Sequence, residues 1–119
     1  MYKRQQYEQL LISDSNVSAP AHYVRTMALE LQQSGVGLVT SLVVGTGEET
    51  VGAKLENLHL TSGIASGVAL PNELGVPVVL GKSMLFRASE FERLGGFASV
   101  ANVLAEDYVI GRMLSLIHI

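Results

Sequence analysis

Two aspartates in distant segments are the residues of this sequence whose surroundings best suit chemistry. Asp14 follows the apolar run 10–12 and precedes Asn16 by two positions. A carboxylate and a side-chain carbonyl at a strand end can reach one hard divalent cation together with phosphate oxygens, and Mg²⁺ or Mn²⁺ is the natural ion. Asp and Asn after a strand are also common turn and helix-capping residues, so a purely structural role stays open.

The second aspartate, Asp107, stands beside Glu106 in the first turn of a helix that the sequence predicts over residues 104–114. A helix N-terminus favours an ionised carboxylate, which makes Asp107 a candidate general base. Acidic residues are also frequent in first helical turns without any catalytic role, and that interpretation stays open as well.

A glycine and two polar residues lie between the two acids in the sequence: Gly81, Lys82 and Ser83. Glycine lets the backbone bend or approach a ligand closely, and the two polar side chains could meet a phosphate or sugar hydroxyls. A glycine at a kink in a strand explains the same residues without a ligand.

Composition narrows the class of protein. Of 119 residues, 48% are hydrophobic and 16% are charged, which is enough to bury the core of one domain or of part of one. The net charge of −3 and the scattered Lys and Arg residues give no basic surface, so no nucleic acid partner is expected. The absence of cysteine removes disulfides and thiolate metal sites. The sequence shows neither a signal peptide nor a membrane span.

Apolar patterns in the first half predict a strand, a helix and a second strand. The run 10–12 is short and apolar, residues 20–33 show helical spacing, and residues 36–44 are nearly all apolar and rich in β-branched side chains. This order predicts a parallel pair of strands joined by a crossover helix.

The second half is less regular, because apolar residues at helical spacing give way to a stretch of small residues with weak periodicity. The predicted elements are a helix from Val51 to Leu58, an open region at 61–70, one strand made of 77–80 and 83–86 with a bend at Gly81, and a short helix at 88–94.

Four motifs in this order closely resemble the middle of the GT-A glycosyltransferases of family 2 and its relatives. They are SDSN after a strand, VGLVTSLVVG, GKSMLFRASEFERLGGF and LAEDYVIGRM, and together they cover about residues 9–113. Within this superfamily the sequence is most similar to the ceramide glucosyltransferase group, including bacterial hopanoid-biosynthesis glycosyltransferases. The resemblance implies an α/β fold: the central and C-terminal part of a Rossmann-like GT-A domain, with a mixed, mostly parallel sheet flanked by helices.

The resemblance also implies residue roles. Asp14 matches the aspartate of a D-x-D-like motif that binds the donor diphosphate through a divalent metal, and Asn16 stands where other members have a second acid. Asp107 matches the general base of inverting members, and Glu106 beside it belongs to the donor-binding set. Residues 81–83 would line the donor sugar pocket.

The implied activity is inverting, metal-assisted transfer of a hexose from a UDP-sugar to a lipid alcohol, ceramide-like or hopanoid-like. The implied location is membrane-associated, with the catalytic domain on the cytoplasmic side. Residues 62–70, rich in Gly and Ala, fall where these enzymes approach lipid. A membrane-surface contact there and a loosely packed loop are both compatible with that composition.

The sequence also departs from the family pattern. It lacks the earlier nucleotide-binding half with its own aspartate, the later Q-x-x-R-W motif and the transmembrane segments, so residues 6–114 are expected to be a partial domain that is inactive alone. Residues 1–5 and 115–119 resemble translated adaptor sequence and are expected to be non-native. The alternative is a non-enzymatic α/β module or a phosphoaspartate-type phosphotransfer domain, although the D-S-N-V-S segment matches the motif of such enzymes poorly.

Overall fold

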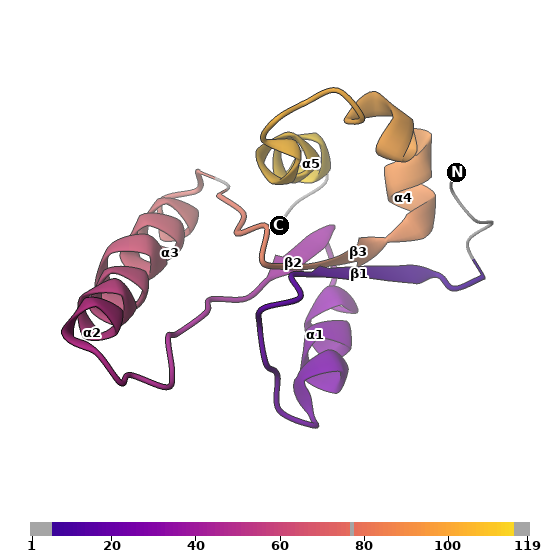
Figure 1. The fold of residues 1–119 in the computed structure, drawn as a ribbon. Helices are drawn as coiled ribbons and strands as arrows, with labels where there is room; N and C mark the ends of the chain where they lie inside the picture. The colour runs from indigo at the N-terminus through magenta and orange to yellow at the C-terminus, as the bar shows by residue number, and fades with distance from the viewer. Residues whose placement is uncertain (1–5, 77, 116–119) are drawn as a thin grey trace.

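A three-stranded sheet with helices on both faces organises the chain (Figure 1). The structure is a computed structural model that describes residues 6–76 and 78–115. In chain order the elements are β1 (Gln9–Ser13), α1 (Tyr23–Leu31), β2 (Leu38–Thr40), α2 (Val51–Leu58), the π-helix η1 (His59–Ile64), α3 (Ala65–Glu73), β3 (Ser83–Arg87), α4 (Ala88–Arg93), the 3₁₀-helix η2 (Gly96–Ser99) and α5 (Glu106–Ser115). Helix α1 covers one face of the sheet, while α4 and α5 lie over the other.

β3 lies between β1 and β2 and pairs antiparallel with both. Leu85 of β3 is in register with Leu11 of β1 and with Val39 of β2. β1 and β2 therefore run in the same direction and are connected through α1, as the sequence predicts, but they are not hydrogen-bonded to each other. The prediction of a mostly parallel sheet is wrong for the described residues, because β3 inserts between these strands and reverses both pairings.

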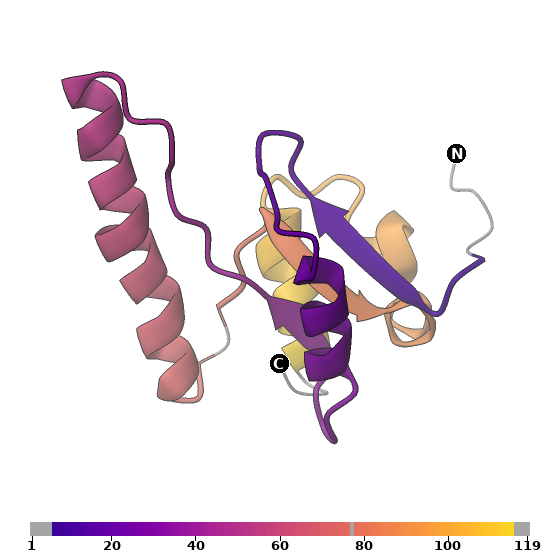
Figure 2. The same cartoon turned by 90° about the horizontal axis from the view of Figure 1, so that it is seen from below.

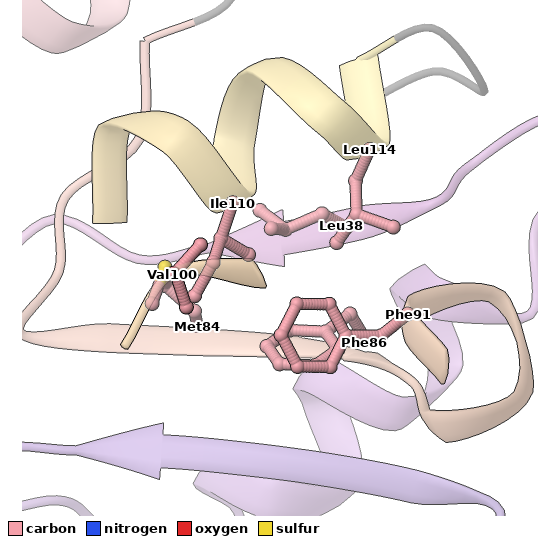
Figure 3. Close-up of a cluster of buried hydrophobic side chains, with 7 residues drawn as sticks. All are labelled: Leu38, Met84, Phe86, Phe91, Val100, Ile110 and Leu114. Atoms are coloured by element: carbon pink, nitrogen blue, oxygen red, sulfur yellow. The ribbon is translucent and has the colours of Figure 1, made fainter. Parts of the chain in front are cut away.

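The central position of β3 follows from its side chains. Ser83, Met84, Leu85 and Phe86 are all buried, so this strand needs cover on both faces. Successive side chains point to opposite faces, which sends Leu85 toward α1 and its neighbours toward α4 and α5. The larger of the two resulting clusters contains Leu38, Met84, Phe86, Phe91, Val100, Ile110 and Leu114 (Figure 3).

An arginine at the end of β3 connects α1 to the sheet. Arg87 donates from Nη1 to the carbonyl oxygen of Val36 over 2.7 Å, and from Nη2 to that of Leu31, the last residue of α1. The carbonyls at a helix C-terminus lack partners within the helix, so the guanidinium satisfies one of them. The helix predicted over residues 20–33 is confirmed with tighter bounds.

The second strand is shorter than the sequence predicts. β2 contains only Leu38–Thr40 of the predicted residues 36–44, because its pairing with β3 ends where Thr40 faces Met84. The chain then leaves the sheet, and Ser41 and the apolar residues 42–44 stay outside the ladder. The prediction from the apolar run 36–44 therefore overestimated the length of this strand.

The region left open by the sequence is part of one long helix. The predicted helix Val51–Leu58 is confirmed as α2, and η1 and α3 continue it without a break to Glu73 (Figure 2). Thr50 caps its start, because its Oγ1 accepts a hydrogen bond from the amide of Ala53 over 3.1 Å. Residues 61–70 are mostly small and form no clear apolar face even within the regular α-helix α3, which explains their weak periodicity.

Three predictions concern the last third of the chain. The bent strand is wrong in its first part, since residues 78–82 form no strand and β3 begins at Ser83; residue 77 lies outside the described residues. The short helix is confirmed as α4, Ala88–Arg93. The last helix begins at Glu106 and places both acids in its first turn, as predicted.

Candidate active site

An open cavity of about 850 Å³ lies where the end of β1 meets the turn before β3 and the start of α5. Asp14 contributes from the residue after β1, and Asp107 from the first turn of α5. The two acids, far apart in the sequence, thus face one space. The cavity is lined by Ile12, Asp14, Leu80, Gly81, Lys82, Met84, Phe97, Val100, Ala101, Val103, Leu104, Glu106, Asp107 and Ile110.

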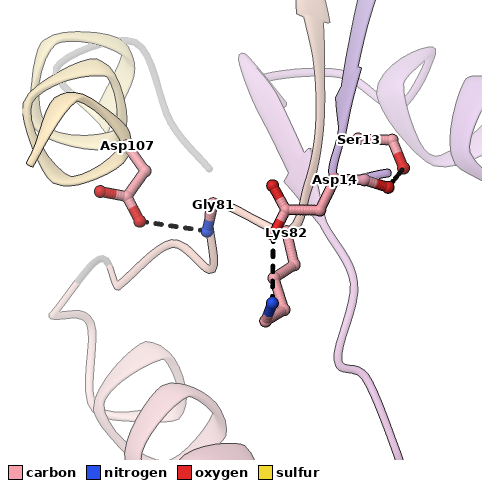
Figure 4. A network of polar contacts seen from close by, with 5 residues as sticks. All are labelled: Ser13, Asp14, Gly81, Lys82 and Asp107. Carbon is pink, nitrogen blue, oxygen red and sulfur yellow. Dashed lines mark hydrogen bonds and ion pairs between the residues drawn. The ribbon is translucent and has the colours of Figure 1, made fainter. Parts of the chain in front are cut away.

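The turn at residues 80–83 lies between the two acids (Figure 4). The amide of Ser83 donates to the carbonyl oxygen of Leu80 over 3.3 Å and closes the turn. Gly81 points its amide at Asp107, and Lys82 extends its side chain to Asp14. This short segment therefore contacts both candidate functional groups.

Asp107 is oriented by two backbone amides. The amide of Gly81 donates to Oδ2 over 3.2 Å, and the amide of Tyr108 donates to Oδ1 over 2.8 Å. A Cβ atom at position 81 would lie 2.5 Å from Oδ2, closer than nonbonded atoms approach. The glycine is therefore required here by the close approach of the carboxylate, not by a left-handed backbone angle.

Asp14 is joined to the same turn by backbone and side chain. Its amide donates to the carbonyl oxygen of Lys82 over 3.1 Å, and Oδ2 lies 3.1 Å from the Lys82 ammonium. The side chains of Lys82 and Asp14 are 33% and 47% exposed, so their ion pair contributes only about 0–1 kcal/mol. A ligand with stronger charges can displace this pair at low cost.

Five of the seven predicted site residues line the cavity: Asp14, Gly81, Lys82, Glu106 and Asp107. Asn16 is exposed and does not line it. Ser83 is only 3% exposed, and its hydroxyl forms a hydrogen bond with that of Tyr23, away from the cavity. The structure thus brings the two acids, the lysine and the glycine together and leaves these two residues apart.

One wall of the cavity is apolar, which the sequence analysis did not predict. The loop before α5 supplies Val100, Val103 and Leu104, and Phe97 of η2 adjoins them. Leu104 is fully exposed, although a side chain of this kind gains free energy by leaving water. The sequence signal was its position two residues before the acidic pair, which looked like ordinary helix periodicity.

Three carboxylates line the cavity, those of Asp14, Glu106 and Asp107, and the sequence assigns the divalent metal to Asp14. In the two described ranges, no group of three or more His, Cys, Asp or Glu side chains is arranged to hold a metal ion. Asp14 lines the cavity and uses one carboxylate oxygen for Lys82, so its other oxygen can bind a cation. One carboxylate together with substrate phosphates is a common arrangement for Mg²⁺. The residues fit an ion that arrives with a diphosphate.

The sequence matches glycosyl transferase family 21 over residues 1–117. The chain belongs to this family. Family 21 membership confirms that this is a glycosyltransferase sequence and supports the resemblance to the ceramide glucosyltransferase group. It implies a nucleotide-sugar donor and an acceptor substrate, and the cavity between Asp14 and Asp107 is the candidate site for them. No solved structure matches the family 21 chain.

Among the described residues of this family 21 chain, no helix is both long enough and apolar enough to cross a bilayer.

Proposed function

We propose that the chain carries the donor- and acceptor-side groups of an inverting hexosyltransferase that uses a UDP-sugar and a lipid alcohol, ceramide-like or hopanoid-like. One observation supports this most strongly: in a family 21 sequence, two acids and a lysine from three segments line the same cavity. A non-enzymatic module would not need this convergence of charge.

In the proposed reaction, Asp107 is the general base. An acceptor hydroxyl attacks the anomeric carbon, its proton passes to a carboxylate oxygen of Asp107, and the bond from that carbon to the diphosphate oxygen breaks. UDP leaves with the bonding electron pair, and this single displacement inverts the configuration. The amides of Gly81 and Tyr108 hold the carboxylate in one orientation, which reduces the entropy lost in reaching the reactive geometry.

On the donor side, the diphosphate would replace the carboxylate of Asp14 as the partner of Lys82, freeing Asp14 for the metal. A divalent ion, Mg²⁺ or Mn²⁺, would supply positive charge to the departing diphosphate. Lys82 adds its own positive charge from the protein. Gly81 and Glu106 line the cavity beside these groups and complete the proposed donor contacts.

The apolar wall suits an acceptor with a hydroxyl at one end and hydrocarbon at the other. Val103 and Leu104 line the same cavity as Asp107 and come just before α5 in the chain, so an apolar body could contact them while its hydroxyl reaches Asp107. Burial of hydrocarbon against such side chains contributes about 25 cal/mol per Å².

A membrane-surface contact is proposed for the long helix, including residues 62–70. Val51, Leu55 and Leu58 on its first half are largely exposed and follow one another at helical spacing. A helix with such an apolar stripe can lie in a membrane interface. This contact supports the proposal of a membrane-associated enzyme, and the cytoplasmic side for its catalytic domain is proposed from the resemblance to the ceramide glucosyltransferase group alone.

A GT-A domain larger than this chain is also part of the proposal. A mostly parallel sheet needs further strands, and the outer edges of β1 and β2 are the places in the described sheet where they could pair. An upstream strand-end aspartate and a downstream Q-x-x-R-W motif in the flanking gene sequence would support this extension. Flanking sequence that lacked both would contradict it.

The donor-side proposal predicts metal-dependent sugar transfer by the complete enzyme. With UDP-[¹⁴C]glucose and ceramide in mixed vesicles, EDTA should abolish transfer to the lipid, and Mg²⁺ or Mn²⁺ should restore it. Asp14→Asn should require a metal concentration higher by about tenfold or more for half-maximal activity, since it removes a charged ligand. Glu49→Gln, an exposed residue outside the cavity, is the control. Full activity in EDTA would contradict the proposal.

A further inference from the structure

We propose that Thr40, which is outside the cavity lining, is a positioning residue for both acids because its hydroxyl fixes the turn at residues 80–83. This inference rests on the proposed roles of Asp14 and Asp107. It adds a residue from β2 to a site otherwise built from the end of β1, the turn and α5.

The hydroxyl of Thr40 contacts both ends of the turn. Oγ1 accepts a hydrogen bond from the amide of Leu80 over 3.2 Å. It also lies 3.0 Å from the carbonyl oxygen of Ser83 and 3.2 Å from that of Leu80, and its single proton can go to one of them at a time. The turn's own closing bond, Ser83 amide to Leu80 carbonyl, is 3.3 Å long. Thr40 thus adds a second, shorter connection across it.

The turn at residues 80–83 contacts both acids, so a hydrogen bond from Thr40 to this turn affects both of them. The amide of Gly81 orients the carboxylate of Asp107 over 3.2 Å, and Lys82 contacts Asp14 through both its carbonyl oxygen and its ammonium. A shift of the turn therefore moves the partners of both acids together. Thr40 itself lines no part of the cavity, so it acts through these residues and does not touch the substrate.

The position of Thr40 makes its effect local. It is the last residue of β2, in register with Met84 of β3 and next to the Val39–Leu85 pair of the same ladder. The strand fixes the residue, and the hydroxyl transmits that fixed position to the turn. The substitution Thr40→Val keeps the shape and β-branching while it removes the hydroxyl, so the amide of Leu80 loses its side-chain acceptor.

The test compares Thr40→Val, Thr40→Ser and Thr26→Val in the complete enzyme, with kcat and donor KM measured per folded molecule well below the unfolding midpoint. Thr26 is the matched control, because it is exposed on α1 and its hydroxyl donates to the carbonyl oxygen of His22 over 3.1 Å. We expect kcat to fall by about 10- to 100-fold in Thr40→Val, the usual cost of misplaced groups. Thr40→Ser should restore most of it, and Thr26→Val should match the unsubstituted enzyme.

A second measurement covers the case in which the valine enzyme is recovered poorly. Amide exchange in the ¹⁵N-labelled 119-residue chain should become at least about tenfold faster at Gly81 and Asp14 in Thr40→Val, because local opening of the turn exposes both amides. The amide of Ile12, at a hydrogen-bonded position of the β1–β3 ladder, reports on the sheet as a whole. Faster exchange at all three amides would mean general destabilisation and would overturn the inference.

The outcomes separate this inference from the proposed function. If the unsubstituted enzyme transfers sugar and Asp107→Asn does not, but Thr40→Val has normal kcat and normal exchange at Gly81, the positioning role is wrong while the function stands. If the unsubstituted enzyme transfers no sugar, the proposed function fails, and exchange at Gly81 and Asp14 still decides whether Thr40 fixes the turn.

Discussion

The sheet with its covering helices and the long helix at residues 51–73 are built on different principles. In the sheet region, all seven residues of the cluster around Phe86 and Phe91 are buried. The centroids of these two rings are 4.9 Å apart, and the rings meet edge to face. In the long helix none of α2 is buried, and Val68 is the one buried residue of α3. Figures 1 and 2 both show this helix to one side of the sheet. The first region is stabilised by packing, the second by local helical bonds.

The candidate site lies entirely in the sheet region. Every residue lining the cavity comes from the sheet, its turns or the segment from η2 to α5, and none comes from residues 51–73. A site that depends on exact placement gains from rigid surroundings. The long helix can therefore interact with other partners, such as the proposed membrane surface, without moving the acids.

The largest expected effect is in the sheet core. Phe86→Ala should lower the free energy of unfolding by about 3–5 kcal/mol, because it leaves a cavity in a fully buried cluster. Denaturant unfolding followed by circular dichroism measures this loss. Leu55→Ala in α2 is the control, and a loss there equal to that of Phe86→Ala would show that both regions are stabilised by packing.

Replacing glycine by alanine should lower the activity in the sheet region and leave it unchanged in the long helix. Gly81→Ala places a Cβ against the carboxylate of Asp107, so kcat of the complete enzyme should fall by about 100-fold. Gly67→Ala in α3 meets no atom within 4 Å and should leave kcat unchanged. Steady-state transfer assays on the two variants test this difference. Normal turnover in Gly81→Ala would mean that sugar transfer does not depend on the position of the Asp107 carboxylate.

The two regions are joined by a side chain. Asn72 near the end of α3 donates to the carbonyl oxygens of Val68 and Val78 over 2.9 and 2.7 Å, and its Oδ1 accepts from the amide of Val78 over 3.2 Å. Asn72→Ala should cost about 1–3 kcal/mol and speed amide exchange at Val78. The equivalent change at Asn102, exposed in the loop before α5, serves as control. Unchanged amide exchange at Val78 in Asn72→Ala would show that Asn72 does not connect the long helix to the segment before β3.

The smallest effect concerns helix propensity. Gly67→Ala should stabilise the long helix by about 0.5–1 kcal/mol, because alanine loses less backbone entropy than glycine in a helix. Helical ellipticity should rise while the unfolding midpoint of the sheet region stays nearly constant. A large upward shift of that midpoint would show that the helix and the sheet unfold as one unit.

The sequence predicted the elements whose patterns are local. Val51–Leu58 was identified by helical spacing, and the position of Asp107 by the acidic start of α5. It could not predict that β3 inserts between β1 and β2, because strand order depends on contacts between distant segments. It left residues 61–70 open for another reason: their small side chains form no clear apolar face, even where α3 is a regular helix.

The site was predicted in part for the same reasons. Asp14 and Asp107 could be found from residue type and position after a strand or at a helix start, and Lys82 from its place beside Gly81. Ser83 looked equally polar in the sequence, but its place inside β3 turns its hydroxyl toward Tyr23. The contact of Thr40 with the turn joins residues 40 positions apart, and no local pattern reveals it.

Substitution of the proposed base tests the central claim most directly. Asp107→Asn in the complete enzyme keeps the shape of the side chain but removes its basic oxygen, so kcat should fall by about 10²–10⁴-fold. Binding of the UDP-sugar, measured by calorimetry, should change by no more than about threefold. Glu56→Gln on the long helix should behave like the unsubstituted enzyme. Transfer by Asp107→Asn at the unsubstituted rate would contradict the assignment of this cavity as the catalytic site.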